Sequence, residues 1–464
     1  MNRTLPILCF IAAIVIMAVA FPEGVVGVLL VVVFSTVVIL VIRQNAEEKH
    51  FLINIFLIAL LIRLLFATIS YVFKLQGFFG EDAFLYDEMA NRLSQIWIGA
   101  TPGIDPESLA AMSTAQPGWG MNYIIGFIYL VCGRNMLAGQ FFCSVIGAAT
   151  APMVYTCASE IYHNERVSKI SAILVALFPA FIVWSSQLLK DGIIIFLLVL
   201  AMTMILRLQK KFNYVGIGLL ALSLFGILAF RFYIFYIVGV AVAGSFIIGT
   251  SSSTKSIIRG FVSLVIIGGV LAYVGALQSA GTSLEKYGSL ERVQASRSDY
   301  SRSNSGFGED LNVSTPMGAL AAIPTGFTYL MLAPFPWEIS NIRQAITLPE
   351  MLLWWACIPI LLSGLWYTLK TKLRTAIPIL LFSLMLTLGY SIFQGNVGTA
   401  YRQRAQIQVF LFMFIAVGWT LTLERRENSK LAKNSRKKRP HHYENRDEDT
   451  KESLLKGEKE PDEE

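Results

Sequence analysis

About twelve apolar runs, each near the roughly 20 residues that a helix needs to cross a bilayer, take up most of this chain of 464 residues. Hydrophobic residues make up 55% of the chain and charged residues only 15%, whereas soluble domains carry roughly 25% charged residues. The sequence therefore predicts an all-α polytopic membrane protein, with about twelve transmembrane helices and further helices in the outer membrane interface. The predicted spans fall near residues 5–21, 24–42, 51–73, 137–158, 166–185, 191–207, 213–230, 232–249, 257–276, 350–368, 375–393 and 405–423.

The basic residues of the short connectors predict how the chain is oriented. If the spans alternate in direction, these connectors all fall on one side, which the positive-inside rule makes cytoplasmic. The net charge of +7 therefore reflects orientation in a bacterial or archaeal cytoplasmic membrane, and no nucleic-acid partner is expected. The basic connector residues are Arg43, Lys49, Arg166, Lys169, Arg207, Lys210, Lys211, Lys255, Arg259, Lys370, Lys372 and Arg374.

Three parts are predicted from this order of spans. Residues 1–50 hold two additional N-terminal transmembrane helices, of which the first resembles a signal peptide but is expected to stay uncleaved. Residues 51–423 form a membrane catalytic domain with outward loops at 74–136 and 277–349. Residues 424–464 begin basic and end acidic, which predicts a charged, disordered cytoplasmic tail.

The outward loops contain two further apolar stretches that are unsuited to crossing the membrane. Residues 119–132 are too short, and residues 317–337 are interrupted by prolines, which break helices. Both are predicted to be helices that lie in the outer interface. Residues 281–316 are rich in Ser, Gly, Arg and Asp, which leaves two interpretations open, a mobile loop and a lid over a substrate.

An acidic stretch opens the first outward loop, where Glu81, Asp82 and Asp87 follow the third apolar run. Charge beside lipid is costly and tends to be retained for function. The same predicted face also receives cations and a further carboxylate from distant parts of the chain, namely Lys190, Asp191, Arg231, Arg402 and Arg404.

Carboxylates and several cations at one membrane face suit the transfer of a sugar from a lipid phosphate. A carboxylate can take the proton from an attacking hydroxyl, and fixed cations can stabilise the departing phosphate. Structural roles are the alternatives: Asp82 as the N-cap of a helix at 83–97, Asp87 as a solvated acid, and Lys190 and Asp191 as an ion pair. Arg402 and Arg404 would then be headgroup anchors.

Several motifs resemble a known class of membrane enzyme. Asp82 is followed by Tyr86 and Ala90, a Pro-led helix runs from Pro117 to Gly133, and a helix ending at Pro179 leads to Asp191. Gly398, Arg402 and Arg404 precede the last span. Over residues 51–423 this pattern resembles the GT-C class of membrane glycosyltransferases, in particular the protein O-mannosyltransferase and lipid A aminoarabinose-transferase branch.

The resemblance implies that Asp82 is the catalytic carboxylate, that Asp191 is a second catalytic acid in the pocket, and that the reaction inverts the sugar. The implied partners are a polyprenyl-phosphate sugar donor, membrane lipids and a glycan, lipid or protein acceptor, with the active site facing outward. Substrate contacts are expected from Glu81, Tyr86, Asp87, Lys190, Arg231, Arg402 and Arg404. No cofactor is certain, although the wider class allows a divalent metal ion held by Glu81, Asp82 and Asp87.

This chain also departs from the branch at Ala83, where Glu is frequent, at Gln116, where the aminoarabinose transferases carry Lys, and at Gln140, where Arg is common. Two other functions therefore remain as alternatives. A glycan polymerase or ligase would use a polyprenyl-diphosphate oligosaccharide, with its key residues in 281–343. A transporter would place ionisable residues deep in its spans, where Arg63 is the one clear example.

Overall fold

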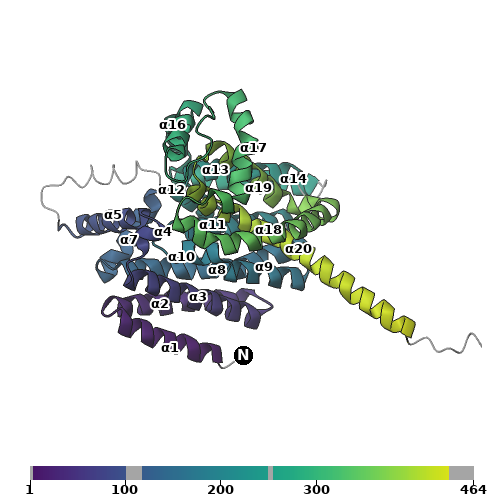
Figure 1. Cartoon of the computed structure of the whole chain (residues 1–464), viewed down its shortest axis with the longest axis horizontal. Coiled ribbons are helices and arrows are strands. Elements are labelled where there is room, and N and C mark those ends of the chain that lie inside the picture. Colours follow the sequence, from purple (N-terminus) through teal and green to yellow (C-terminus); the bar gives the residue numbers. More distant parts are fainter. Residues whose placement is uncertain (1–3, 101–117, 249–253, 438–464) are drawn as a thin grey trace, which may run out of the picture.

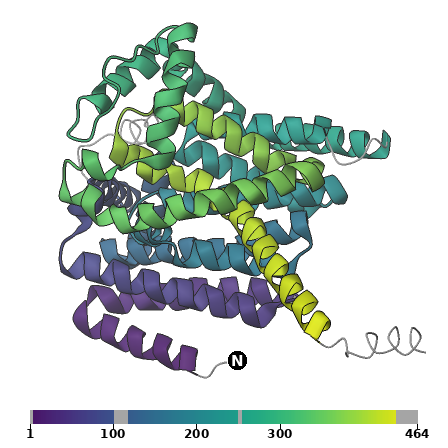
Figure 2. The same cartoon turned by 45° about the vertical axis from the view of Figure 1, so that its right-hand side comes forward.

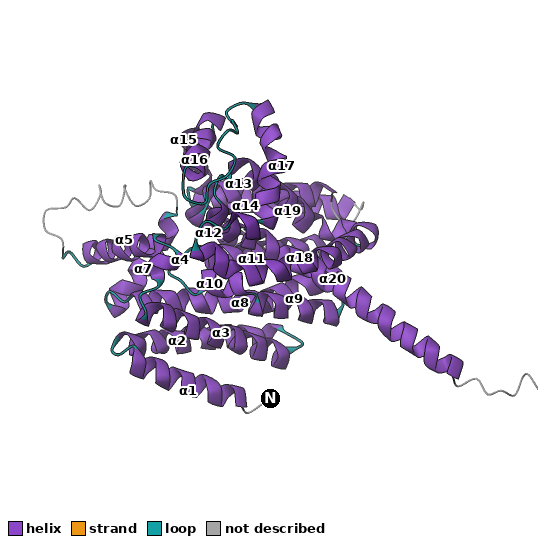
Figure 3. Ribbon diagram, in the orientation of Figure 1, coloured by secondary structure: helices purple, strands orange, loops and turns teal. Residues whose placement is uncertain are grey.

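The computed structural model describes residues 4–100, 118–248 and 254–437. Within these ranges the regular structure is helical (Figure 3), apart from an isolated antiparallel bridge between Gly306 and Asn396. The predicted all-α polytopic fold is confirmed. The elements are α1 (Thr4–Val19), α2 (Glu23–Asn45), α3 (Lys49–Val72), α4 (Gln76–Phe79), α5 (Asp82–Trp97), α7 (Trp119–Cys132), α8 (Met136–Tyr162), α9 (Glu165–Leu177), α10 (Pro179–Ser185), α11 (Asp191–Lys210), α12 (Tyr214–Phe230), α13 (Phe232–Ile248), α14 (Thr254–Tyr273), α15 (Ala276–Tyr287), α16 (Leu290–Ser301), α17 (Pro316–Leu332), η1 (Pro336–Glu338), α18 (Ile342–Thr371), α19 (Leu373–Phe393) and α20 (Val397–Lys437).

The described helices include 7 that are long and apolar enough to cross a membrane, or 9 if each of two bent pairs counts as one span. The bent pairs are α9 with α10, at 56°, and α14 with α15, at 78°. The other three predicted spans are the helices α1, α12 and α13, which have 16, 17 and 17 residues. The chain is therefore a multi-pass membrane protein.

The N-terminal helices form one side of the bundle, where α1, α2 and α3 lie in successive layers below α8 (Figures 1 and 2). Their buried residues form a hydrophobic cluster of their own, to which Phe141 of α8 contributes. A Cβ at Gly27 of α2 would lie 2.7 Å from the Phe141 ring. The two additional N-terminal helices are thus packed tightly onto the rest of the membrane domain.

Helices α18 and α20 approach each other unusually closely. A Cβ at Gly364 would lie 1.8 Å from the carbonyl oxygen of Phe414, and one at Gly418 would lie 2.1 Å from that of Ile360. These backbones can touch only because neither position carries a side chain. The contact fixes α20, which carries Arg402 near its first turn.

The two loops predicted to face outward contain helices. Helix α7 has the predicted bounds 119–132, and α17 with η1 accounts for most of 317–337. Residues 281–316, for which a mobile loop was one interpretation, instead contain the end of α15 and all of α16. Helices α5 and α7 lie at the end of the bundle where α3 ends (Figure 1).

The predicted disorder of the whole tail from residue 424 is wrong for its first part. Helix α20 continues without a break to Lys437 and projects beyond the bundle (Figure 2). Arg166 donates to Glu427 at 3.0 Å, which ties this extension to α9. The remainder of the tail lies outside the described residues.

Candidate active site

Helix α5 brings Asp82 to the surface of the site. The helix starts at Asp82, the N-cap position is occupied by Glu81, and no side chain caps the helix. The alternative that Asp82 is an N-cap is therefore wrong. Its side chain is 51% exposed and accepts a hydrogen bond from Nη1 of Arg402 at 2.9 Å.

Asp191, the first residue of α11, lies behind this pair and is fully buried. One of its carboxylate oxygens accepts from Nε of Arg402 at 2.6 Å, and the other accepts from Nη2 of Arg231 at 2.8 Å. Asp82, Arg402, Asp191 and Arg231 thus form one continuous chain of ion pairs. We refer to these four residues as the ionic chain.

The ionic chain continues into the bundle through tyrosines. Arg231 donates to the hydroxyl of Tyr233 at 3.0 Å and to that of Tyr390 at 3.3 Å. The Tyr390 hydroxyl in turn donates to Oε1 of Gln406 at 2.7 Å. A buried charge is tolerated only when it is paired and hydrogen-bonded, and these contacts engage both terminal nitrogens of Arg231.

Lys190 lies beside the ionic chain but forms no ion pair within the described part of the protein, so the alternative of a Lys190–Asp191 ion pair is wrong. Its Nζ lies 5.8 Å from the centre of the Tyr86 ring. Burial, together with the positive charge of Arg231, lowers the pKa of Lys190 to about 8. Burial and the charge of Asp82 raise the pKa of Tyr86.

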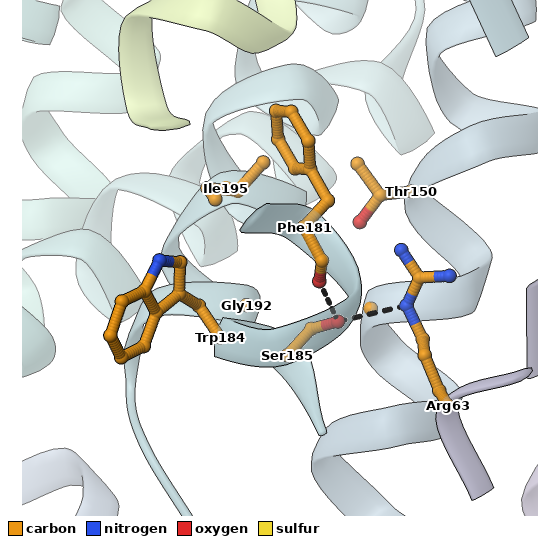
Figure 4. A pocket seen from close by; sticks show the side chains of 8 residues that line it. Arg63, Thr150, Phe181, Trp184, Ser185, Gly192 and Ile195 are labelled. Carbon is orange, nitrogen blue, oxygen red and sulfur yellow. Dashed lines mark hydrogen bonds between the residues drawn. The ribbon is translucent and has the colours of Figure 1, made fainter. Parts of the chain in front are cut away.

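The turn that carries Lys190 and Asp191 depends on a break in the helix before it. Pro179 cannot continue α9, so the chain bends into α10 and the last carbonyls of α9 lose their helical partners. Arg63 of α3 donates to the carbonyl oxygens of Ala176 at 3.0 Å and Val175 at 3.4 Å, and to Oγ of Ser185 at 2.8 Å (Figure 4). This intramembrane arginine therefore supports the broken span.

Ser185 lies where three helices meet. A Cβ at Gly147 of α8 would lie 2.3 Å from Cβ of Ser185, and one at Gly192 of α11 would lie 2.7 Å from it. The cavity between these helices and Arg63 has a volume of about 10 Å³, close to the smallest space that holds a single water molecule. It is a packing gap lined by Arg63, Phe181 and Trp184 among others (Figure 4), and it is too small for a sugar.

Buried amides hold the other end of this turn. Nε2 of Gln187 donates to Oγ of Ser70 at 3.0 Å, and Nε2 of Gln140 donates to Oε1 of Gln187 at 3.2 Å. Gln140, which departs from the Arg that the resemblance led us to expect, thus contacts the turn. Through Gln187, its side chain helps to hold the turn that carries Lys190 and Asp191.

Two predicted contact residues lie apart from the ionic chain. Asp87, interpreted as a substrate contact or a solvated acid, is buried and accepts from the Tyr129 hydroxyl at 2.6 Å and from Nη2 of Arg134 at 2.6 Å. Arg404 is fully buried and donates to the carbonyl oxygens of Met331 and Ala333, both at 3.0 Å. Arg404 therefore serves inside the protein, where it binds backbone carbonyls at the end of α17.

Glu81 is exposed next to Asp82. The carboxylate of Asp87 accepts hydrogen bonds from Tyr129 and Arg134. It is therefore not grouped with Glu81 and Asp82, the other two carboxylates suggested for a divalent ion. In the described ranges, no group of at least three His, Cys, Asp or Glu side chains is arranged to hold a metal ion.

Sequence reasoning missed several residues of the site, namely Tyr233, Tyr390 and Gln406. A signal for Gln406 was present, since it follows Arg402 by four residues on a helix and therefore lies on the same face. The tyrosines gave no comparable signal, because aromatic residues are common throughout the spans.

This geometry defines a polytopic membrane protein with a charged site at one end of its bundle. Residues 120–273 match the family model described as "Dolichyl-phosphate-mannose-protein mannosyltransferase", a stretch that includes Lys190, Asp191 and Arg231. The match confirms the predicted resemblance to the GT-C class and supports a membrane glycosyltransferase.

Among solved structures, the chain is similar to the archaeal oligosaccharyltransferase AglB from Archaeoglobus fulgidus, solved with an inhibitory peptide and a dolichol-phosphate. The identity is 13% and the TM-score 0.48; the similarity covers 84% of this chain and 52% of that chain. No curated protein sequence matches the chain.

Proposed function

We propose that this protein transfers a sugar, a hexose or a pentose, from a polyprenyl-phosphate carrier to a glycan, lipid or protein at the outer face of the cytoplasmic membrane. The ionic chain carries this proposal, because it joins distant segments and ends at the half-exposed carboxylate of Asp82. The match to a family named for a dolichyl-phosphate donor supports a lipid phosphate as the carrier.

Asp82 acts as the general base in this proposal. The hydroxyl oxygen of the acceptor attacks the anomeric carbon of the donor sugar, and Asp82 accepts the hydroxyl proton. The bond between the anomeric carbon and the phosphate oxygen breaks, and its electron pair leaves with the polyprenyl phosphate. A single displacement of this kind inverts the anomeric carbon.

Arg402 links the base to the leaving group. It contacts both Asp82 and Asp191, so a phosphate that binds Arg402 competes with Asp82 for the same guanidinium. Donor binding then frees the Asp82 carboxylate to accept a proton, and Arg402 stabilises the charge that develops on the phosphate.

The charge of the site favours a monophosphate donor over a diphosphate donor. Three cations (Lys190, Arg231 and Arg402) face two carboxylates (Asp82 and Asp191), which leaves one positive charge in excess (3 − 2 = 1). A sugar phosphodiester carries one negative charge and balances this excess. A diphosphate, as a glycan polymerase or ligase would use, brings a second charge without a partner.

Asp191 acts as a positioning residue in this scheme. Both of its carboxylate oxygens are occupied by arginines and its side chain is 0% exposed. We therefore assign it to orienting Arg231 and Arg402, in place of the second catalytic acid that the resemblance implied.

The proposal is tested with purified protein in detergent, a panel of radiolabelled polyprenyl-phosphate sugars as donors, and the envelope fraction of cells that lack the protein as acceptor. Release of free polyprenyl phosphate is expected for the wild type and is expected to be lost in Asp82→Asn. Glu88→Gln is the matched control, because Glu88 lies on the same helix and forms an exposed ion pair with Arg92. Full release by a folded Asp82→Asn protein contradicts the role of Asp82.

A further inference from the structure

The outward segment 276–308 is docked onto the turn that opens α20. The backbone N–H of Phe307 donates to the carbonyl oxygen of Gly395 at 2.8 Å, and that of Val397 donates to Ser305 at 2.8 Å. Nδ2 of Asn396 donates to Oγ of Ser305 at 2.9 Å. These contacts lie only a few residues before Arg402, so the segment adjoins the ionic chain.

A buried cation anchors α16 in this position. Arg297 is 1% exposed and donates to the carbonyl oxygens of Ile392, at 3.2 Å, and Gln394. Its guanidinium lies 5.6 Å from the centre of the Phe307 ring. Because its hydrogen bonds go to backbone carbonyls, Arg297 holds α16 against the end of α19 rather than binding an anion.

One turn further along α16, Tyr300 extends an aromatic wall that starts at the ionic chain. Arg231 donates to Tyr233, whose ring centre lies 6.0 Å from that of Phe393, and Phe393 lies 6.3 Å from Tyr300. Tyr300 is 37% exposed. Burial raises the pKa of its hydroxyl, and the charges of Asp82, Arg231 and Arg402 act on it as well.

We propose that Tyr300 is a specificity-determining residue of the site, where its exposed ring packs against the apolar face of a sugar ring. The proposal rests on the proposed function and deepens it. An aromatic ring offers a flat apolar area, which suits the C–H face of a sugar. The sugar belongs either to the donor lipid or to the acceptor glycan.

The experiment compares wild type with Tyr300→Phe and Tyr300→Ala in detergent. Tyr273→Ala is the matched control, since Tyr273 is 92% exposed at the end of α14. The first measurement is the Kd for undecaprenyl phosphate, bare and carrying a hexose or a pentose. The second is the half-saturating amount of envelope fraction from cells that lack the protein, used as acceptor with radiolabelled donor.

If the sugar belongs to the donor, Tyr300→Ala weakens binding of the sugar-bearing lipid about tenfold and leaves the bare lipid unchanged. If it belongs to the acceptor, the half-saturating amount of envelope fraction rises by a similar factor. Tyr300→Phe and Tyr273→Ala should match the wild type, because the platform is retained in both. A variant that has lost its fold would instead bind the bare and the sugar-bearing lipid more weakly to the same extent.

Two outcomes overturn the proposal in different ways. In the first, the wild type binds sugar-bearing lipid, and Tyr300→Ala has the same Kd and the same half-saturating amount of acceptor. This outcome refutes the sugar platform alone. Wild type that binds no sugar-bearing lipid phosphate refutes the proposed function, and the platform with it.

Discussion

Arg402 and Asp82 are separated by 320 positions in the sequence, yet Nη1 of Arg402 lies 2.9 Å from the Asp82 carboxylate. The same guanidinium donates through Nε to Asp191. One side chain therefore joins a half-exposed carboxylate to a fully buried one, and it is the residue on which the proposed chemistry depends most.

Replacing Arg402 by Lys keeps the positive charge but loses the planar fork that reaches both carboxylates. We expect kcat/KM to fall by about 10²- to 10³-fold, as when one charge-stabilising donor is removed from an active site. The measurement is steady-state release of polyprenyl phosphate, with Arg92→Lys on the exposed part of α5 as the control. Near wild-type kcat/KM in Arg402→Lys would show that a point charge is sufficient.

Lys190 predicts a pH dependence of donor binding. A phosphate favours the protonated amine, whose pKa is about 8 in the free protein, so KM for the donor should be constant below pH 8. Above it KM should rise by up to about tenfold per pH unit. Lys190→Met should raise KM at low pH and remove the dependence.

The titration of Lys190 affects folding stability in the opposite direction to donor binding. Its pKa is lowered from an ordinary value of 10.5, so the unfolded chain binds more protons than the folded one between about pH 8 and 10.5. The contribution of Lys190 to stability therefore rises with pH in this window. If KM increases with pH while the unfolding temperature does not fall, the cause is lost phosphate binding and not lost folding.

Arg63→Ala should destabilise the protein by about 2–4 kcal/mol, because it leaves buried backbone carbonyls unpaired and opens a cavity. The carbonyls at stake are those of Val175 and Ala176. Thermal unfolding in detergent checks this, with Arg166→Ala as the control. Arg166 forms an exposed ion pair with Glu427, which water screens, so its loss should leave the unfolding temperature almost unchanged.

Asp87 should affect stability rather than donor binding. Asp87→Asn weakens its contacts with Tyr129 and Arg134, which hold α5 against α7. A double-mutant cycle with Arg134→Gln should give a coupling energy of about 1 kcal/mol, since Arg134 is half-exposed. A raised KM for the donor at unchanged stability would instead return Asp87 to the substrate site.

The predicted shared face of Asp82, Lys190, Asp191, Arg231 and Arg402 follows from hydropathy and connector charge, which depend only on local sequence. The partners of these residues could not be predicted in this way. Asp87 was expected to contact substrate or solvent, whereas its partner Arg134 lies 47 positions away and the pairing needs the packing of α5 on α7.

The position of Arg404 outside the site could have been predicted from helical spacing. It follows Arg402 by two residues, and side chains at that spacing on a helix do not face each other. Because residues 397–423 are helical, the side chains of Arg402 and Arg404 cannot both reach one site. Gln406, four residues from Arg402, was the residue to expect on the same face.

The length of α20 has a mechanical consequence. Arg402 and Glu427 belong to one unbroken helix, and their separation of 25 positions spans about 38 Å at 1.5 Å per residue. A helix of this kind moves as a rod, so a displacement of Arg402 along the helix axis is also a displacement of Glu427 against Arg166. The two ends of the bundle are thus coupled by a single element that is as long as the membrane is thick.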